Sequence, residues 1–449
     1  MLACLRVGRQ GCGMTPKQLS GVQGRLDEFL ETLVEPIGRS ERRHWAGVYV
    51  QGLLLDGERK SVQPMAARID GADEQALNQF LNQSPWAVAE VQRRLAHRLS
   101  DQGHEPVYWM VDETSFPKAG AHSVGAARQY CGALGKIANC QVAVSLHWRQ
   151  GPMSYPMSWR LYLPKAWCED RARRTQARIP ADAIYQTKTD LALELVDQAV
   201  TWDVPRGAVL ADSFYGNDFS FRAALREQQL DYAVAVEPTT VVWTEDPNQV
   251  PVTATAKTGR PRQYPRLQDL PNAVSLAKLA AQLPKKAWRK VTWRIGSKGP
   301  QRSRFALVGV WAAHGWRAQK HPPREREWLL IEWPEAAAAP ADYWMLWRAH
   351  RDAAPPLLQA VRTARGRWPI EQDDRELKEE LGLDHFEGRG WPGWHHHVTL
   401  VTLAFAFLRA EQLRCKKNFT CELAADSTAP TGGADPHDGP MSVVPDDVR

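Results

Sequence analysis

Apolar residues recur at helical spacing through the first quarter of the chain. Leu26, Phe29 and Leu30 begin a pattern of i, i+3 and i+4 positions that continues to about residue 99. Within it, the segment Ser84–Trp86 has the order of an N-cap followed by proline at the first helical position. The pattern predicts an all-helical N-terminal domain over residues 14–104.

The pattern changes at Val107, where a short apolar run rich in β-forming residues ends in Asp112. A second buried run, Ala208–Ala211, ends in Asp212 in the same way. Around these two runs the periodicity predicts strands at 141–146, 157–163 and 232–236 and a helix at 187–200. The resulting order of three strands, helix, strand, helix, strand indicates a mixed α/β domain over residues 105–237.

Residues 238–347 contain short β-like pieces separated by glycine, proline and charged turns, which predicts a β-rich insertion subdomain with strands at 290–295, 304–311 and 327–333. Helical character returns over residues 348–413. Pro369 at the first turn and Gly382 beyond the last fit one helix, and an apolar helix follows at 395–413. Residues 414–449 are rich in Asp, Pro, Gly, Ser and Thr and are predicted to be a disordered tail.

Composition narrows the class of protein. The 449 residues are 43% hydrophobic and 24% charged, and no run of eighteen apolar residues offers a membrane span, so we expect a cytoplasmic protein of two or three domains. Residues 1–13 are predicted to be an unstructured start without a signal peptide, and Met14 is an alternative initiator to Met1. The seven cysteines are scattered without a CxxC pair, which predicts reduced thiols rather than a zinc site.

The formal charge of +6 and the pI near 8.9 favour a polyanionic partner, although many other proteins are equally basic. The N-terminal domain holds two basic groups. They are Arg39, Arg42, Arg43 and His44, and then Arg93, Arg94 and Arg98. These cations would face DNA phosphates or, equally well, form a solvated helical face.

Three carboxylates are candidates for catalysis. Asp112 and Asp212 each follow a buried strand, at the edge where α/β sheets usually build their sites, although either one alone would serve equally well as a cap. Glu371 falls near the third position of its helix, close to the positive end of the helix dipole. Arg375 and Lys378 share its face, which suits phosphate binding but also a surface helix with ion pairs.

Three carboxylates at one edge suit two divalent cations about 3.5–4 Å apart, of which one activates a water or 3′-hydroxyl and the other stabilises the leaving oxygen. Mg²⁺ keeps several of its waters and needs few protein oxygens, so no Cys or His ligand is required. The consecutive His395, His396 and His397 point about 100° apart on a helix and cannot all bind one metal. We therefore expect one or two of them to be buried structural histidines.

Four segments together resemble one family. They are Val111–Lys118, Gly125–Gly132, Ala211–Gly216 and Arg367–Arg389, with the last containing Arg-Trp-Pro-Ile-Glu. These segments are similar to the catalytic segments of insertion-sequence DDE transposases of the 701 type, part of the larger insertion-sequence 4 group, and the likeness covers about residues 107–408. Arg367, Glu371 and Lys378 match the Tyr, Arg, Glu, Lys signature of that group, but its tyrosine position is Ala364 here.

The resemblance implies an RNase H-like catalytic core, formed by residues 105–237 and 348–413 and interrupted by the β-rich insertion. It implies that Asp112, Asp212 and Glu371 are the catalytic, metal-binding residues, with Mg²⁺, or alternatively Mn²⁺, as cofactor. The expected partners are double-stranded DNA, both transposon ends and target, and a second copy of the chain when ends are bound. The expected reaction is cleavage at the terminal repeats and joining of the 3′-hydroxyl ends to target DNA.

The family likeness also implies contacts to DNA. Arg367 and Lys378 would contact backbone phosphates near the cut, and Arg128, Lys136 and Lys188 are weaker candidates for the same role. Hairpin-forming cleavage, in which a flipped base stacks on an aromatic of the insertion, is a further expectation. The stacking candidates are Trp243, Trp288, Trp293 and Trp311, each of which fits a place in the core as well.

Two other functions remain open from the sequence. One is a DNA-binding regulator that descends from a transposase and has lost its catalytic activity. The other is a carbohydrate-cleaving enzyme, which would use the 19 tryptophans and a pair of carboxylates. Chelation by EDTA would distinguish a transposase from a carbohydrate-cleaving enzyme, because two-metal phosphoryl transfer stops without metal whereas glycoside hydrolysis of this type continues.

Overall fold

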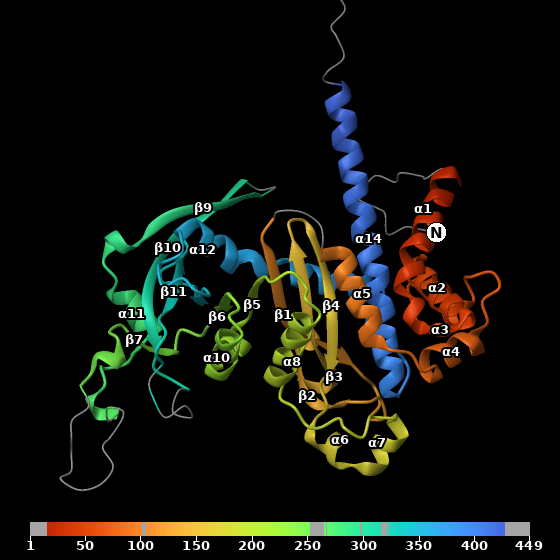
Figure 1. The fold of residues 1–449 in the computed structure, drawn as a ribbon, viewed down its shortest axis with the longest axis horizontal. Coiled ribbons are helices and arrows are strands. Elements are labelled where there is room, and N and C mark those ends of the chain that lie inside the picture. The colour runs from red at the N-terminus through yellow and green to blue at the C-terminus, as the bar shows by residue number, and fades with distance from the viewer. Residues whose placement is uncertain are drawn as a thin grey trace, which may run out of the picture.

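The computed structural model describes residues 16–100, 105–251, 265, 267–296, 299–315, 321 and 323–426. The N-terminal part is helical, as predicted, and lies on one side of the molecule in Figure 1. Its helices are α1 (Pro16–Leu33), α2 (Ser40–Leu54), α3 (Val62–Ala66), α4 (Glu74–Gln83) and α5 (Val88–Ser100). The predicted unstructured start lies outside the described residues.

The predicted helix start at Ser84 is wrong. Ser84 is the C-cap of α4, and the next helix begins only at Val88. The indole ring of Trp86 stacks on His396 with ring centroids 4.1 Å apart, and on the other side faces Phe80 at 6.4 Å. The intervening segment is extended because this packing, rather than the local capping signal, positions the tryptophan.

A mixed sheet forms the centre of the molecule and contains the predicted order of strands and helices. Its first half has the order β2-β3-β1-β5-β6, with β4 also paired to β3. β1, β5 and β6 are parallel, whereas β2, β3 and β4 form antiparallel pairs. The strands are β1 (Val107–Pro117), β2 (Ala127–Cys131), β3 (Lys136–Gln150), β4 (Met153–Leu161), β5 (Ala208–Ala211) and β6 (Tyr232–Ala235).

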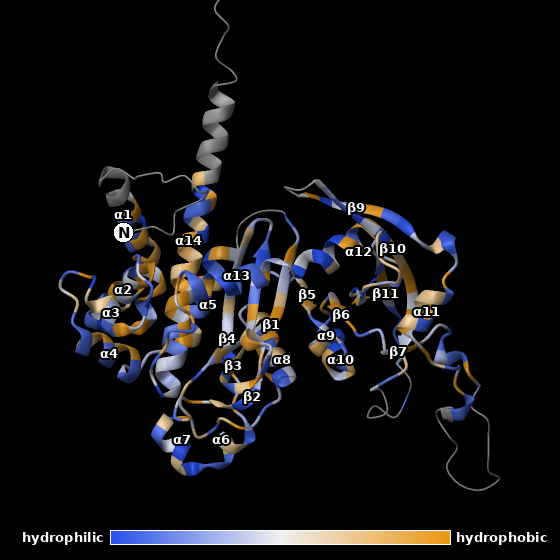
Figure 2. Cartoon of the chain, turned by 180° about the vertical axis from the view of Figure 1, so that it is seen from behind, coloured by the Kyte–Doolittle hydropathy of each residue, from blue (hydrophilic) through white to orange (hydrophobic). Residues whose placement is uncertain are grey.

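The first strand is longer than predicted. β1 does not end before Asp112 but continues to Pro117, because Glu113–Pro117 pair with Cys140–Val144 of β3. The helices of this half are α6 (Lys165–Glu169), α7 (Arg171–Ala177), α8 (Lys188–Thr201), α9 (Ser213–Gly216) and α10 (Phe219–Glu227). The ribbon of α10 carries both colours in Figure 2, as expected for a helix with one face on the sheet.

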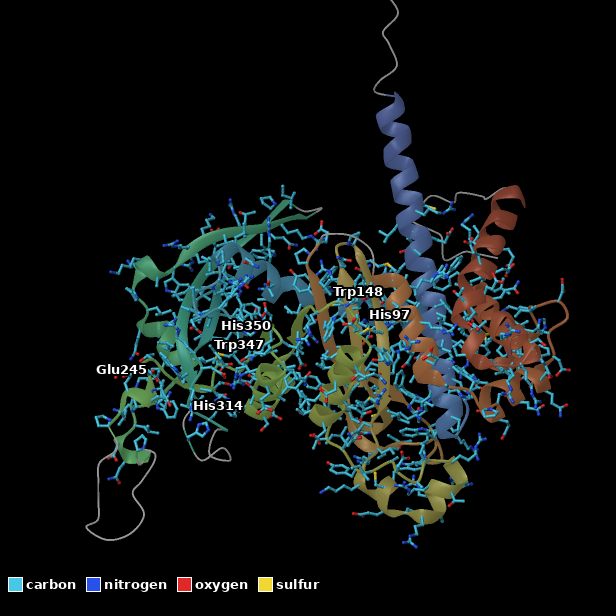
Figure 3. The ribbon with its side chains drawn as sticks, in the orientation of Figure 1. His97, Trp148, Glu245, His314, Trp347 and His350 are labelled. Carbon is cyan, nitrogen blue, oxygen red and sulfur yellow. The ribbon has the colours of Figure 1, made fainter. Side chains whose placement is uncertain are left out.

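The sheet continues through β6 into its second half in the order β12-β11-β10-β7-β8, with β9 paired to β10. These elements are β7 (Val241–Trp243), β8 (Val274–Ser275), α11 (Leu276–Gln282), β9 (Arg289–Gly296), β10 (Gly299–Ala312), β11 (Glu327–Trp333) and β12 (Asp342–Trp347). The predicted strands of this region correspond to β9, β10 and β11. At the junction of the two halves Trp347, labelled in Figure 3, pairs with Tyr232. The two rings stack with centroids 6.2 Å apart.

Three helices complete the chain: α12 (Leu357–Ala364), α13 (Pro369–Glu379) and α14 (Trp391–Asp426). α14 packs on β4 and on α2, α4 and α5, so it joins the N-terminal helices to the sheet. Its backbone is helical beyond Leu413, where the predicted helix ended, and the remaining tail from residue 427 lies outside the described residues. Within the described part of the chain, no helix is both long enough and apolar enough to span a membrane.

Candidate active site

Asp112 and Asp212 meet at the edge where β1 and β5 run side by side. The parallel register pairs Tyr108 with Ala208 and Met110 with Leu210, so that two further residues along each strand place the aspartates opposite each other. Asp212 immediately follows β5 and is the N-cap of α9, where its Oδ1 accepts hydrogen bonds from the backbone N–H groups of the next turn. One carboxylate oxygen therefore caps the helix, and the second is available for another role.

The carboxyl group of Asp112 is mostly buried, with 14% of its side chain exposed. Burial raises its pKa to about 7, against the attraction of Arg367, and the nearby carboxylates of Asp374 and Asp212 raise it further. Its Oδ1 accepts from the backbone N–H of Glu113 at 2.9 Å. Acids crowded in this way are stabilised in their ionised form by an added cation.

Glu371 lies in the first turn of α13, which begins at Pro369 as predicted, and 59% of its side chain is exposed. Arg367 connects it to the first aspartate, since the guanidinium is 2.6 Å from Asp112 Oδ2 and 3.5 Å from Glu371 Oε1. The three predicted carboxylates therefore come to one region from β1, β5 and α13. No group of three His, Cys, Asp or Glu residues among the described residues is arranged to hold a single metal ion.

The predicted DNA-binding cations divide into two sets. Lys188 lies 2.7 Å from Glu113, which is the neighbour of Asp112, and Lys378 donates to the carbonyl oxygen of Ser115 at 3.3 Å. With Arg367, these two are beside the carboxylates. The other three cations are exposed and make no ion pair within the described residues; they are Arg128, Lys136 and Arg375.

The second basic group of the N-terminal domain is engaged within the protein. Arg93 and Arg94 form ion pairs with Glu90, and Arg94 also pairs with Glu35. The guanidinium of Arg98 donates to the Thr32 hydroxyl at 2.8 Å. The first group is better placed for an external partner, because Arg39 and Arg43 are exposed at the start of α2. Arg42 is half-buried and donates to the carbonyl oxygen of Pro85 at 3.0 Å.

The four tryptophans predicted to stack a flipped base all pack against other groups. Trp243 is 2% exposed, and Trp311 lies opposite it in the β10–β7 pair. Trp288 packs edge-on against Trp333 at 5.1 Å, and Trp293 packs against Phe305 at 5.5 Å. Among the described residues, two exposed aromatics close in sequence to the acids were not predicted: Phe214, 51% exposed, and Trp368, 55% exposed. Their closeness to Asp212 and Glu371 along the chain was the available signal.

A buried polar network on α13 was also missed. Asp373 accepts hydrogen bonds from Ser154 and from Arg409, the latter at 2.8 Å, and lies 3.5 Å from the ring of His147. Burial acts to raise the pKa of Asp373, but these partners hold it below the ordinary value. Burial raises the pKa of the adjacent Asp374, although His147 is 3.7 Å away. The pKa is therefore lowered for Asp373 and raised for Asp374, although the two acids are neighbours in the chain.

The three consecutive histidines do not converge. His395 Nδ1 is 2.9 Å from the carbonyl oxygen of Trp391, His396 Nδ1 is 2.7 Å from that of Leu81, and His397 Nδ1 is 2.9 Å from the Tyr49 hydroxyl. Burial lowers their pKa values to about 3, 4 and 3, respectively. Each is thus a neutral structural group with its own partner.

The chain belongs to the family of DDE superfamily endonucleases, whose model matches residues 32–300, more than half of its length. This match contains both aspartates, whereas Glu371 lies outside it. Family membership implies an RNase H-like core, which agrees with the order of β1, β3, β4, β5 and β6, and enzymes of this family use divalent metal ions. It also overturns the carbohydrate-cleaving alternative.

A more particular similarity is to the probable transposase for insertion sequence element IS701 from Microchaete diplosiphon. The two sequences are 32% identical over 188 residues, which is 41% of this chain and 46% of that protein. The matched region therefore spans about half the length of the relative. The resemblance to 701-type transposases is confirmed at this level.

Proposed function

We propose that this protein is the transposase of an insertion sequence, which binds the terminal repeats of its element, cleaves phosphodiester bonds and joins the 3′-hydroxyl ends to target DNA. One observation carries the proposal. Asp112 and Asp212 each lie two residues beyond Met110 and Leu210, the last pair of the parallel strands β1 and β5, and Arg367 links Asp112 to Glu371. Three carboxylates with a guanidinium among them form a site for a phosphate group and divalent cations.

The donor set fits Mg²⁺, with Mn²⁺ as a substitute. All three side chains offer only carboxylate oxygens, and Mg²⁺ is commonly bound by one or two carboxylates together with water and substrate phosphate. Asp112 with Asp212 would hold one ion and Asp112 with Glu371 the other, so no ion needs three protein ligands. When bound, the ions activate the attacking water or 3′-hydroxyl and stabilise the leaving oxygen.

The cations around the carboxylates would bind and orient the scissile strand. Arg367 presents a planar guanidinium that matches two phosphate oxygens, and it already lies within 2.6 Å of Asp112. Lys378 lies on the α13 side and Lys188 on the α8 side of the acids. A strand that crosses the site would thus be held on both sides of the reacting phosphate.

We assign the helical domain over residues 14–104 to binding of transposon ends, with Arg39, Arg42 and Arg43 as phosphate contacts. Residues 105–237 and 348–413 would form the RNase H-like core, and 238–347 the β-rich insertion. We expect a homodimer on paired ends. If cleavage passes through a hairpin, Trp368 is the exposed tryptophan beside the acids that could stack an extruded base.

The alternative function is a DNA-binding regulator without catalytic activity. The observation that favours it is Ala364, which stands where the related group has a tyrosine and is 5% exposed in the core. The experiment that separates the two incubates the protein with a labelled duplex carrying the terminal repeat of its element, with Mg²⁺ or with EDTA. Metal-dependent cleavage at the repeat boundary supports the transposase, whereas binding without cleavage supports the regulator.

A further inference from the structure

Aromatic and cationic side chains gather on the α8 side of the candidate active site. They are Tyr162, Tyr185, Phe214, Lys165 and Lys188, and we call them the aromatic–lysine surface. Phe214 is 51% exposed and Tyr185 is 36% exposed, although burial of a large aromatic side chain would stabilise the fold. Exposed aromatics that cluster beside a catalytic site indicate a surface that binds a ligand.

The members of this surface form a continuous series of contacts. Lys188 Nζ lies 5.3 Å from the ring centroid of Phe214 and 6.0 Å from that of Tyr162. The ring of Tyr162 meets that of Tyr185 edge-on at 6.4 Å, and Lys165 Nζ lies 5.0 Å from the Tyr185 ring. The order along the surface is therefore one ring, one ammonium group, two rings in contact and a second ammonium group.

The surface begins at the carboxylates themselves. The backbone N–H of Phe214 donates to Asp212 Oδ1 at 3.1 Å, so the exposed ring is two residues from a proposed metal ligand. At the same end, Lys188 pairs with Glu113, the residue after Asp112. A DNA strand that leaves the site on this side would pass directly over Phe214.

Aromatic rings interspersed with cations suit unpaired nucleotides better than a duplex. Nucleobases in a duplex have their faces covered by neighbouring base pairs, whereas an unpaired base can stack on an aromatic ring while a lysine neutralises its phosphate. Tyrosine and phenylalanine stack without regard to sequence, because every base has a π-face. The chemistry of the surface therefore matches a short single-stranded segment of DNA.

We propose that the aromatic–lysine surface binds unpaired nucleotides of the strand adjacent to the scissile phosphate. This inference rests on the proposed function, because it takes DNA as the substrate of the neighbouring acids. It places a single-strand subsite in the catalytic core, separate from the insertion tryptophans that the sequence favoured. Such a subsite would hold the melted end of the element while the acids act on its phosphate.

The experiment compares two fluorescent duplexes that carry the terminal repeat, one blunt and one with a short unpaired extension at the cleavage position. Affinity is measured by anisotropy in EDTA, which prevents cleavage. We expect Phe214→Ala and Tyr185→Ala each to weaken binding of the extended duplex by about tenfold, since stacking contributes ~1–3 kcal/mol per base. Binding of the blunt duplex should change less than twofold.

Two matched variants make the comparison specific. Phe214→Trp keeps a stacking ring and should restore affinity for the extension, whereas Leu358→Ala, at an exposed side chain on α12, should bind both duplexes as the wild type does. Equal losses on both duplexes, or no loss on the extended one, would overturn the inference. A wild-type protein that neither binds nor cuts either duplex would instead overturn the proposed function.

Discussion

Two clusters of ionisable residues in this protein have opposite organisation. The histidines at positions 395–397 lie on α14, where His396 and His397 are buried and His395 is partly buried, and each ring has a partner of its own. Asp112, Asp212 and Glu371 come together from three elements, and Asp112 and Glu371 share a single guanidinium, that of Arg367. A core cluster satisfies each polar group separately, whereas the acid cluster concentrates charge of one sign. The second arrangement is the one that a metal-dependent site requires.

The largest effect is expected from neutralising the acids. Asp112→Asn, Asp212→Asn and Glu371→Gln each remove a charge that would hold a divalent cation, which contributes several kcal/mol to phosphoryl transfer. Cleavage of a terminal-repeat duplex should fall by about 10³-fold or more, measured by single-turnover gel assays. Binding of the same duplex should remain within a few-fold of the wild type, and retained cleavage in any of the three would contradict the assignment.

For the three histidines at positions 395–397, the expected effect is on the stability of the fold and its dependence on pH, not on cleavage. In the folded protein the pKa values of the three histidines are lowered to about 3 or 4 from an ordinary 6.5. Their contribution to the free energy of unfolding is therefore fully present above pH 6.5 and is lost as the pH falls towards the lowered pKa values. Between pH 6.5 and 5 each histidine should cost ~2 kcal/mol. Asp112, with its raised pKa, offsets part of this loss.

Urea unfolding at a series of pH values measures this dependence. His396→Gln should reduce the slope of unfolding free energy against pH by about one proton, because one buried imidazole no longer takes up a proton on unfolding. A wild-type stability that is constant between pH 6.5 and 5 would show that these rings are charged in the folded protein.

Asp373 and Asp374, which are adjacent on α13, provide a second comparison, with smaller expected effects on stability. Asp373→Asn should destabilise the fold by ~1–3 kcal/mol, because it breaks the bonds to Ser154 and Arg409 in a buried site. Asp374→Asn should be neutral or stabilising, since burial already disfavours its ionised form. Thermal unfolding of the two variants tests the contrast, and equal losses would refute it.

Arg367→Lys should have the smallest effect on cleavage among the site variants. The substitution keeps the positive charge but loses the planar fork that can meet two carboxylates or two phosphate oxygens. We expect cleavage to fall by about tenfold, equivalent to ~1.4 kcal/mol, with metal dependence unchanged. Arg362→Lys, at an exposed position of α12, is the control and should leave cleavage unaffected.

The sequence predicted the elements of the fold better than their ends. Alternating and helical periodicities located β5 and α8 because those segments are amphipathic or wholly buried. The end of β1 was misplaced because Glu113–Pro117 are polar in part, and their strand conformation depends on pairing with a distant segment, Cys140–Val144. Ser84 was misread for a similar reason, since Trp86 packs on His396, more than 300 residues away.

The candidate site was predictable as far as it depends on strand ends. Asp112 lies just beyond the last residue of β1 that pairs with β5, and Asp212 follows β5, so two apolar runs that each end in a carboxylate were enough to select them. The proline before Glu371 marks the start of its helix. The network of His147 with Asp373 was not predictable, because it joins β3 to α13 through contacts that no periodicity reveals. The aromatic side chains that could stack a base were not predictable either, because their exposure depends on strand pairing and packing.

The central claim is that the three carboxylates form the metal site, and the most direct test is Mn²⁺ binding to the complex of protein and terminal-repeat duplex. Binding is measured through the decrease in the electron paramagnetic resonance signal of free Mn²⁺. The account predicts that the wild type and His396→Gln bind Mn²⁺ alike and that Asp112→Asn loses most of this binding. Unchanged binding in Asp112→Asn, or its loss in His396→Gln, would contradict the assignment of the metal site to the three carboxylates.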